Sequence, residues 1–343
     1  MKIAAKFTRR GKFVASRFLI GGLLLAAITA GLASTAPAQD RAGRVKALME
    51  RAQQKRALPS DPNPTKIAAA GTYRFHFTHN GLRRDYLVHV PAKAIGRSAP
   101  VVLALHGGGG DMDYQAQNYG LVEKSERAGF ILVAPNGTSR FRSGILATWN
   151  AGACCGRAVE QKVDDVGFLR EVIVRVATQV SIDRGRVFAT GMSNGGLMSY
   201  RLACEAPDMI RAIAPVAGTD NTLACKPSRP VPVIHFHARD DSHVLFNGGH
   251  GPDSVVDTNF TSVPASIAKW VKLNSADPKA QTVLSVPGAR CQLHKGPAPV
   301  EVCITEAGGH SWPGSQTRRA NKNPSQAISA NDRMWDFFSS LSR

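Results

Sequence analysis

The sequence predicts an α/β protein with a doubly wound, mostly parallel sheet in a single domain. From residue 101 onward, short apolar runs alternate with longer segments of helical periodicity. Parallel strands are buried on both faces and therefore give nearly continuous apolar runs between helices. One such run leads into the turn Gly191-Met192-Ser193-Asn194-Gly195, which a helix-forming segment follows. Open α/β sheets bind ligands at the carboxyl ends of their strands, so we expect a functional site there.

The expected elements follow in order along the chain. Residues 71–90 alternate between apolar and polar side chains around His79-Asn80-Gly81, which predicts a β-hairpin. Buried strands are expected at 101–105, 131–134, 187–189, 213–216, 231–236 and 302–305. Helices are expected at 119–128, 166–180, 196–204, 264–274 and 330–341. Asp164 and Asp165 precede the second of these helices, and capping it would explain one of them.

Residues 1–38 have the three parts of a secretory signal peptide. A basic start precedes an apolar run at 18–33, and Ala36-Pro37-Ala38 forms a small-x-small cleavage site. The run is shorter than the ~20 residues that a membrane-spanning helix needs. We therefore expect cleavage after Ala38, no stable membrane span afterwards, and a secreted or periplasmic protein. Arg9-Arg10 leaves both the Sec and the twin-arginine export routes open.

The chain behind the signal peptide is basic. Residues 39–70 predict an N-terminal linker, and residues 71–343 the α/β domain that carries the site. The net charge is +18, of which the signal peptide contributes six, leaving about +12. A basic surface suits an acidic envelope or polysaccharide, although simple solubility explains it as well and is the interpretation we favour. No basic-aromatic motif or recognition-helix pattern occurs, so nucleic acid is not an expected partner.

Six cysteines remain after the signal peptide, and an even number in an exported protein indicates disulfide bonds. They are Cys154, Cys155, Cys204, Cys225, Cys291 and Cys303. Cys291 and Cys303 flank Lys295-Gly296-Pro297, so a hairpin would bring them face to face. Adjacent cysteines rarely bond to each other, because the geometry resists it. We therefore expect Cys154 and Cys155 to reach Cys204 and Cys225, in an order that stays open.

The segment around Ser193 has the pattern of a nucleophile elbow, a G-x-S-x-G between a strand and a helix. Such a turn holds the serine in a strained backbone conformation, and a side chain at Gly191 or Gly195 would collide with the neighbouring elements. Ser193 would then lie at a helix N-terminus, where backbone N–H groups favour developing negative charge. A strand-to-helix turn without chemistry is the alternative, and the flanking pattern favours a catalytic serine.

A glycine run follows the first buried strand, at His106-Gly107-Gly108-Gly109-Gly110. Acyl transfer needs hydrogen-bond donors directed at the oxyanion of its tetrahedral intermediate. We assign these donors to the backbone N–H groups of Gly108 and Asn194, with Gly107 or Gly109 as alternatives to Gly108. No G-K-[ST] follows the run, so it does not predict a phosphate-binding loop.

A general base and its acid partner are expected in the loops after later strands. His310 lies in a glycine-rich loop after the last strand, and its imidazole could take the serine proton and return it. The acid should follow the strand at 231–236, where Asp240 and Asp241 are adjacent. Only one of them can orient His310. We choose Asp241, because pairing with Arg239 or capping a turn suits Asp240 better.

The remaining candidates are weaker. His106 is expected to pack beneath the glycine run. His235 and His237 alternate along a strand, which suggests a zinc pair, but a third ligand is not obvious. No C-x-x-C pair with a partnering histidine occurs either, so no metal site is expected. Trp149 and Trp312 are candidates for flanking an acyl-binding pocket, with core or rim packing as the alternative.

Several blocks together resemble the secreted poly(3-hydroxybutyrate) depolymerase-like esterases and the feruloyl esterases of the same superfamily. The blocks lie at 105–110, 149–156, 163–168, 191–196, 247–249 and 309–314. The resemblance covers roughly residues 72–341 and implies the α/β-hydrolase fold, with Ser193, Asp241 and His310 as the triad. The family motif H-G-T-A-D appears here as His237-Ala238-Arg239-Asp240-Asp241, and its register to Asn247-Gly248-Gly249 places Asp241 on the family acid.

The resemblance and the motifs together predict a secreted serine esterase that works through an acyl-enzyme and needs no cofactor. We expect soluble hydroxyalkanoate oligomers or short esters as substrates, because family members that attack solid polyester often carry an additional binding domain. A feruloyl or acetylxylan esterase acting on plant polysaccharide is the first alternative. An acyltransferase, or a non-catalytic hydrolase fold that binds the cell envelope, is the second.

Overall fold

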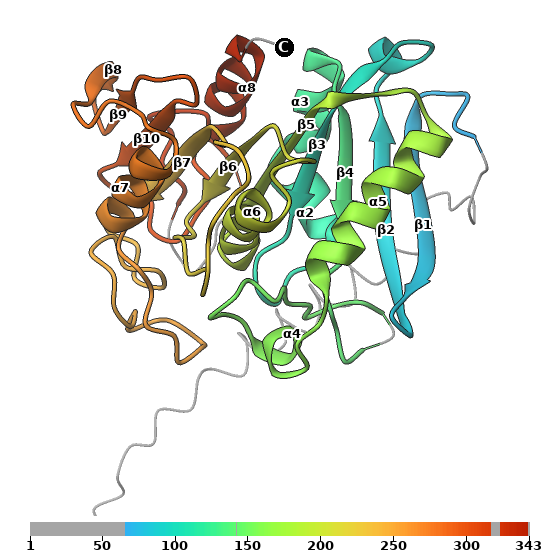
Figure 1. Cartoon of the computed structure of the whole chain (residues 1–343), viewed down its shortest axis with the longest axis horizontal. Coiled ribbons are helices and arrows are strands. Elements are labelled where there is room, and N and C mark those ends of the chain that lie inside the picture. The colour runs from blue at the N-terminus through green and yellow to red at the C-terminus, as the bar shows by residue number, and fades with distance from the viewer. Residues whose placement is uncertain (1–65, 142, 317–322, 342–343) are drawn as a thin grey trace, which may run out of the picture. The chain divides into compact units, whose positions relative to one another are not determined.

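The computed structural model describes residues 66–141, 143–316 and 323–341. These residues lie within one compact unit, Ala57–Arg343, and form one ten-stranded sheet of order β1-β2-β4-β3-β5-β6-β7-β10-β9-β8 (Figure 1). The predicted signal peptide and all but the last few residues of the predicted linker lie outside the described residues. The predicted doubly wound α/β sheet is confirmed.

Six parallel strands form the centre of the sheet. They are β4 (Ile131–Pro135), β3 (Ala99–Leu105), β5 (Ile182–Met192), β6 (Ala212–Val216), β7 (Val233–Ala238) and β10 (Val300–Thr305). Antiparallel strands extend it on both sides: β1 (Gly71–His79) and β2 (Leu82–Val90) beyond β4, and β9 (Ala289–His294) and β8 (Gln281–Val286) beyond β10. Each predicted buried strand is present, and the predicted hairpin is β1–β2.

Helices cover both faces of this sheet. One layer contains α5 (Asp165–Gln179), α6 (Asn194–Glu205) and α7 (Val263–Leu273), which lie in front of the sheet in Figure 1. The other contains α2 (Met112–Asn118), α3 (Leu121–Ala128) and α8 (Ala330–Ser340). Alternation along β3 explains the two layers, because Val101 and Leu103 pack with the first set while Val102 and Ala104 pack with the second. Two short helices, η1 (Ala92–Ala94) and α4 (Gly156–Glu160), lie in connections.

The two aspartates before α5 have different partners. Asp164 is the N-cap, and its carboxylate accepts a hydrogen bond from the Gly167 N–H at 2.8 Å. Asp165 is fully buried and pairs with Arg84 of β2 at 2.6 Å. Its second oxygen accepts the Asn150 N–H at 2.7 Å. The predicted cap is therefore confirmed, and the adjacent aspartate joins the edge hairpin to the loop after Trp149.

Sequence patterns missed the elements with little apolar character. The side chains of β8 are mostly exposed, so its segment contains no buried apolar run. The α2 helix reads MDYQAQN and shows no amphipathic stripe. The hairpin expected between Cys291 and Cys303 is present as β9–β10, in which these two cysteines are directly paired and disulfide-bonded.

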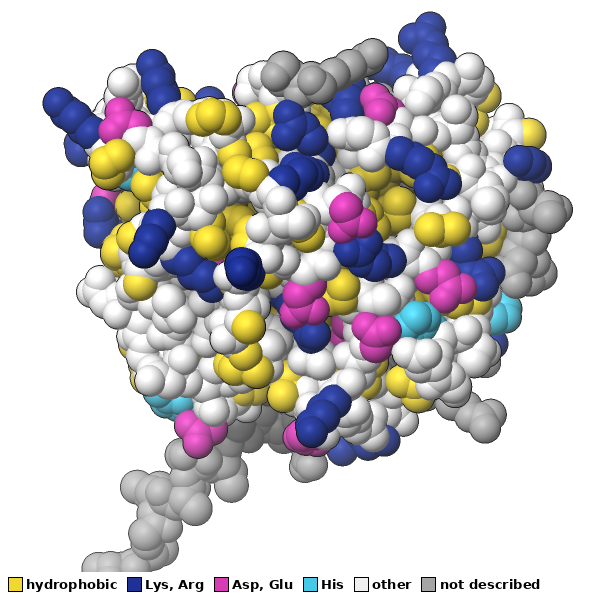
Figure 2. All heavy atoms as spheres, viewed as in Figure 1, with side chains coloured by type: hydrophobic (Ala, Val, Ile, Leu, Met, Phe, Trp, Pro, Cys, Tyr) yellow, Lys and Arg dark blue, Asp and Glu magenta, His cyan; other side chains and the backbone are white. Residues whose placement is uncertain are grey.

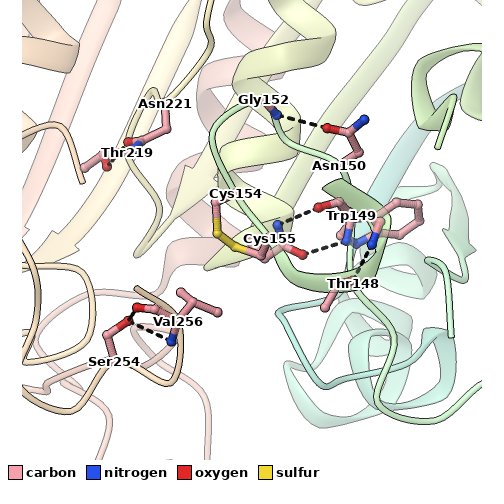
Figure 3. Close-up of a disulfide and its surroundings, with 12 residues drawn as sticks. Thr148, Trp149, Asn150, Gly152, Cys154, Cys155, Thr219, Asn221, Ser254 and Val256 are labelled. Carbon is pink, nitrogen blue, oxygen red and sulfur yellow. Dashed lines mark hydrogen bonds between the residues drawn. A yellow bond between two sulfur atoms is a disulfide. The ribbon is translucent and has the colours of Figure 1, made fainter. Parts of the chain in front are cut away.

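The expected bonding of the other four cysteines was wrong. Cys204 ends α6 and bonds to Cys225 in the loop beyond β6, with the two Cα atoms 5.0 Å apart. Cys154 and Cys155 bond to each other, as Figure 3 shows beside Trp149. The peptide bond between them is cis, and their Cα atoms are 3.1 Å apart. Because Cys204 and Cys225 are close neighbours in the fold, the adjacent pair has no other cysteine to reach.

Charged side chains are spread over the surface. Figure 2 shows lysines and arginines across the face viewed, with acidic side chains among them. On this face the positive side chains are dispersed and do not form a single compact patch. Among the described residues, no helix has the length and apolar character needed to cross a membrane.

Candidate active site

Ser193 occupies a strained turn between β5 and α6. Its backbone has φ 55° and ψ −117°, and its N–H donates to the Val216 carbonyl at 2.8 Å. A Cβ atom at Gly195 would collide with the Leu105 carbonyl, and one at Gly191 would collide with the Gly195 backbone. The geometry expected of a nucleophile elbow is therefore present, and the glycines are needed because adjacent backbone leaves no room for a side chain.

The glycine run lies against the start of α6. A Cβ atom added to Gly108 would be 3.6 Å from the Asn194 Cβ, so the two residues assigned as oxyanion donors are neighbours. The Gly109 N–H donates to the Ala147 carbonyl at 2.9 Å, which engages one of the alternative donors. The glycine run therefore lies beside Asn194, the residue that follows Ser193.

Hydrogen bonds of Trp149 and His106 hold Asn194 and the glycine run in place. The Asn194 side chain accepts the Trp149 N–H at 2.7 Å and donates to the Trp149 carbonyl at 3.1 Å. The Trp149 indole N–H donates to the His106 carbonyl at 3.0 Å. The His106 ring accepts the Gly137 N–H at 2.8 Å, which leaves its Nδ1–H to donate to the Gly107 carbonyl at 2.9 Å. His106 thus packs under the glycine run, as expected.

The two tryptophans predicted to flank an acyl pocket are both buried. Trp149 is 0% exposed, and Trp312 is 1% exposed. Trp312 stacks on Tyr119, with ring centroids 4.8 Å apart, and its indole N–H donates to Asn331 at 3.0 Å. These positions agree with the alternative of core packing, because Trp149 supports the glycine run and Trp312 holds the segment just after His310. A place at an acyl pocket stays a prediction.

His310 and Asp241 form a buried hydrogen-bonded pair. Nδ1 of His310 is 2.8 Å from Oδ2 of Asp241, while Oδ1 of Asp241 accepts the N–H groups of His243 and Val244 at 2.9 and 3.0 Å. Burial raises the pKa of Asp241, but the adjacent His310 and His237 rings and the Val244 N–H lower it more, so the net pKa lies well below its ordinary value. Asp241 is therefore an anion facing the His310 ring.

Asp240 has a different partner. Its Oδ1 accepts the Gly309 N–H at 2.7 Å, which ties the loop after β7 to the residue before His310. The pairing with Arg239 considered for Asp240 is not what the structure contains, because Arg239 pairs with Glu306 at 3.2 Å. The two aspartates thus hold the His310 loop in two ways, one through its backbone and one through the imidazole.

The sheet topology brings the three predicted triad residues to one edge. Ser193 follows β5, Asp241 follows β7 and His310 follows β10, and these parallel strands lie in the order β5-β6-β7-β10. Sequence reasoning missed His243, whose ring stacks on His310 with centroids 4.7 Å apart and planes 10° apart. Only its position two residues after Asp241 could have suggested this contact.

The candidate metal ligands have other roles. The rings of His235 and His237 are hydrogen-bonded to each other, with His235 Nε2 3.1 Å from His237 Nδ1. Within the described residues, two further groups have the spacing of metal ligands, and each consists of two disulfide-bonded cysteines and one acidic residue. A disulfide sulfur is not the thiolate that binds metal, so neither group suits an ion.

Sequence comparison relates the chain to feruloyl and acetylxylan esterases. No protein-family model matches it. A match of 176 residues is 34% identical to feruloyl esterase B of Piromyces equi. This match covers 48% of this chain and 31% of that protein. A match of 161 residues is 29% identical to a bifunctional acetylxylan esterase/xylanase of Neocallimastix patriciarum. This match covers 47% of this chain and 22% of that protein. The matches thus span less than a third of either relative.

Structural comparison shows the fold. An acetyl xylan esterase from Aspergillus awamori superposes with a TM-score of 0.54 at 14% identity, over 77% of this chain and 99% of that one. An S-formylglutathione hydrolase from Agrobacterium tumefaciens gives 0.50 at 13% identity, over 81% and 98% of the two chains. The protein therefore has the α/β-hydrolase fold and is related to feruloyl esterase-like hydrolases. The resemblance to poly(3-hydroxybutyrate) depolymerases stays a prediction.

Proposed function

We propose that the protein is an exported serine esterase that releases feruloyl or acetyl groups from plant polysaccharide. The observation that carries this proposal is the hydrogen-bonded His310–Asp241 pair, which lies at the same sheet edge as the strained elbow of Ser193. The relatives named above support the substrate class, and both carry esterase in their names. The disulfide bonds of the domain support export, because such bonds persist in oxidising compartments.

In this proposal the ester is cleaved through an acyl-enzyme. Ser193 Oγ attacks the carbonyl carbon while His310 Nε2 takes the hydroxyl proton, and His310 then gives that proton to the leaving alcohol. Asp241 holds the proton on Nδ1 of His310 and stabilises the imidazolium. The N–H groups of Gly108 and Asn194 bind the oxyanion. Water, activated by the same histidine, then releases the acid and restores the serine.

A substrate panel tests the reaction and its substrate class together. It contains methyl ferulate, acetylated xylan, hydroxybutyrate oligomers and p-nitrophenyl butyrate, each incubated with the parent protein and with Ser193→Ala. We expect turnover of methyl ferulate or acetylated xylan, and a loss of about 10⁴-fold or more in Ser193→Ala. Hydroxybutyrate oligomers are the second candidate substrate, because the sequence blocks resemble the depolymerase-like esterases.

The outcomes separate the alternatives. Turnover of hydroxybutyrate oligomers in preference to the other esters would replace the polysaccharide assignment but keep the esterase. No turnover of any ester by a folded parent would leave a non-catalytic or acyl-transferring protein and end the proposal. A Ser193→Ala variant as active as the parent would remove Ser193 from the nucleophile role.

A further inference from the structure

Three buried polar rings lie behind Asp241, and the ester reaction does not use them. Tyr200 of α6 and His235 and His237 of β7 are each at most 1% exposed. Polar groups buried in an apolar core cost free energy unless each is hydrogen-bonded. The partners of these rings therefore indicate what the group does.

The three rings form a continuous line of hydrogen bonds that ends at the loop carrying Asp241. The Tyr200 hydroxyl is 3.0 Å from His235 Nδ1, and His235 Nε2 is 3.1 Å from His237 Nδ1. His237 Nε2 is 2.8 Å from the Val244 carbonyl oxygen and 3.4 Å from Oδ2 of Asp241. The Val244 N–H in turn donates to the other oxygen of Asp241. His237 thus contacts the acid directly and also holds the residue that binds it.

The direction of the protons along this line is fixed by its last member. A carbonyl oxygen only accepts, so the proton between His237 and Val244 must be on Nε2 of His237. With a single proton on the His237 ring, its Nδ1 accepts from the Nε2–H of His235, and His235 Nδ1 accepts from the Tyr200 hydroxyl. The reverse direction would place two acceptors 2.8 Å apart at Val244.

Two members of the line, His235 and Tyr200, stay uncharged. Burial, with His237 as a smaller cause, lowers the pKa of His235 well below its ordinary value. Burial, with the charge of Asp220 as a smaller cause, raises the pKa of Tyr200 well above its ordinary value. Tyr200 therefore remains a hydroxyl donor and His235 a neutral ring. His237 therefore presents an oriented Nε2–H to Asp241.

We propose that His237, held by His235 and Tyr200, is a positioning residue that fixes the Asp241 carboxylate against His310. Its Nε2–H holds the Val244 carbonyl and faces the carboxylate oxygen that receives the His310 Nδ1–H. Three rings on two elements of the core thereby restrain a carboxylate that lies on a loop. This inference rests on the proposed role of Asp241 as the acid of the triad.

Two substitutions of similar size separate positioning from packing. A glutamine at residue 237 can place its amide N–H near the position of Nε2, whereas the shorter asparagine reaches only the position of Nδ1. We expect His237→Asn to lower kcat about tenfold with KM within about twofold, and His237→Gln to stay within about threefold of the parent. The deshielded His310 Nδ1–H resonance in the proton NMR spectrum should weaken in His237→Asn and return in His237→Gln.

A control and a milder variant keep the test decisive. His294→Asn changes a histidine on β9 whose ring bonds to the Asp277 carbonyl at 2.8 Å, and it should leave kcat and the resonance unchanged. Tyr200→Phe removes only a hydroxyl and should weaken the resonance less than His237→Asn does. If His237→Asn folds and matches the parent in kcat and resonance, the inference is overturned. If it does not fold, an unchanged resonance in Tyr200→Phe overturns it.

The proposed function can fail independently. A parent that turns over no ester would refute the esterase, while the resonance would still report whether His237 and Tyr200 hold the His310–Asp241 pair. An active parent with an unaltered His237→Asn variant would refute the positioning role alone.

Discussion

At the scale of single residues, the two adjacent aspartates accept hydrogen bonds from different donors. Asp241 accepts from the His310 ring, and Asp240 accepts from the Gly309 backbone. We expect Asp241→Asn to lower kcat by about 10²- to 10⁴-fold, because the amide allows the wrong histidine tautomer. Asp240→Asn should keep most activity, because its amide oxygen can still accept the Gly309 N–H. Assays of both variants on one soluble ester test which aspartate is the acid of the triad. Loss of activity in Asp240→Asn, with activity kept in Asp241→Asn, would assign that role to Asp240.

The ionisation of Asp241 also makes a prediction about stability and pH. Its pKa in the folded protein is lowered, so its ionised form stabilises the fold above the ordinary carboxyl pKa of about 4. That contribution is lost as the pH falls towards the folded-state value. Asp241→Asn should therefore be less stable than the parent at about pH 7, and the difference should narrow at about pH 3. Urea unfolding midpoints measure both, and a difference that does not change with pH would contradict the expectation.

At the scale of elements, the buried Arg84–Asp165 pair joins the edge hairpin to α5. Both side chains are at most 2% exposed, and the Arg84 guanidinium also lies 3.7 Å from the Phe168 ring centroid. Arg84→Met would leave a buried carboxylate without its cation, which typically costs about 3–5 kcal/mol. Urea unfolding should show that loss. The double variant Arg84→Met/Asp165→Asn should recover part of it, because the amide is neutral and still accepts the Asn150 N–H. A double variant no more stable than Arg84→Met would argue against an electrostatic cause.

The elements also show how far sequence patterns reach. The parallel strands and the elbow were predictable, because buried apolar runs and the G-x-S-x-G turn are local signals. The exposed strand β8 carries no such signal. The burial of Trp149 depends on two hydrogen bonds with Asn194, which is distant in sequence. The line of rings behind Asp241 was out of reach for the same reason, because Tyr200 and His235 meet only through the packing of α6 on the sheet.

At the scale of the whole molecule, the charge and the cysteines describe the environment in which the protein works. The whole sequence carries a net charge of +18, and on the face shown in Figure 2 the lysines and arginines of the described residues are dispersed. Physiological salt limits the attraction between such exposed charges and any acidic partner to about 8 Å. The three disulfides lie in different parts of the domain, and the described residues contain no free cysteine.

The pattern of disulfide bonds gives a prediction that distinguishes the structure from the expectation based on sequence. Trypsin should release residues 143–157 as one peptide, which contains both Cys154 and Cys155. If these two bond to each other, the peptide appears alone, lighter than its reduced form by two hydrogen atoms, while residues 202–211 remain joined to the peptide that begins at residue 212. Mass spectrometry of a non-reduced digest, prepared at acidic pH to suppress exchange, makes the measurement. Peptide 143–157 joined to either of the others would restore the bonds to Cys204 and Cys225 that the sequence suggested.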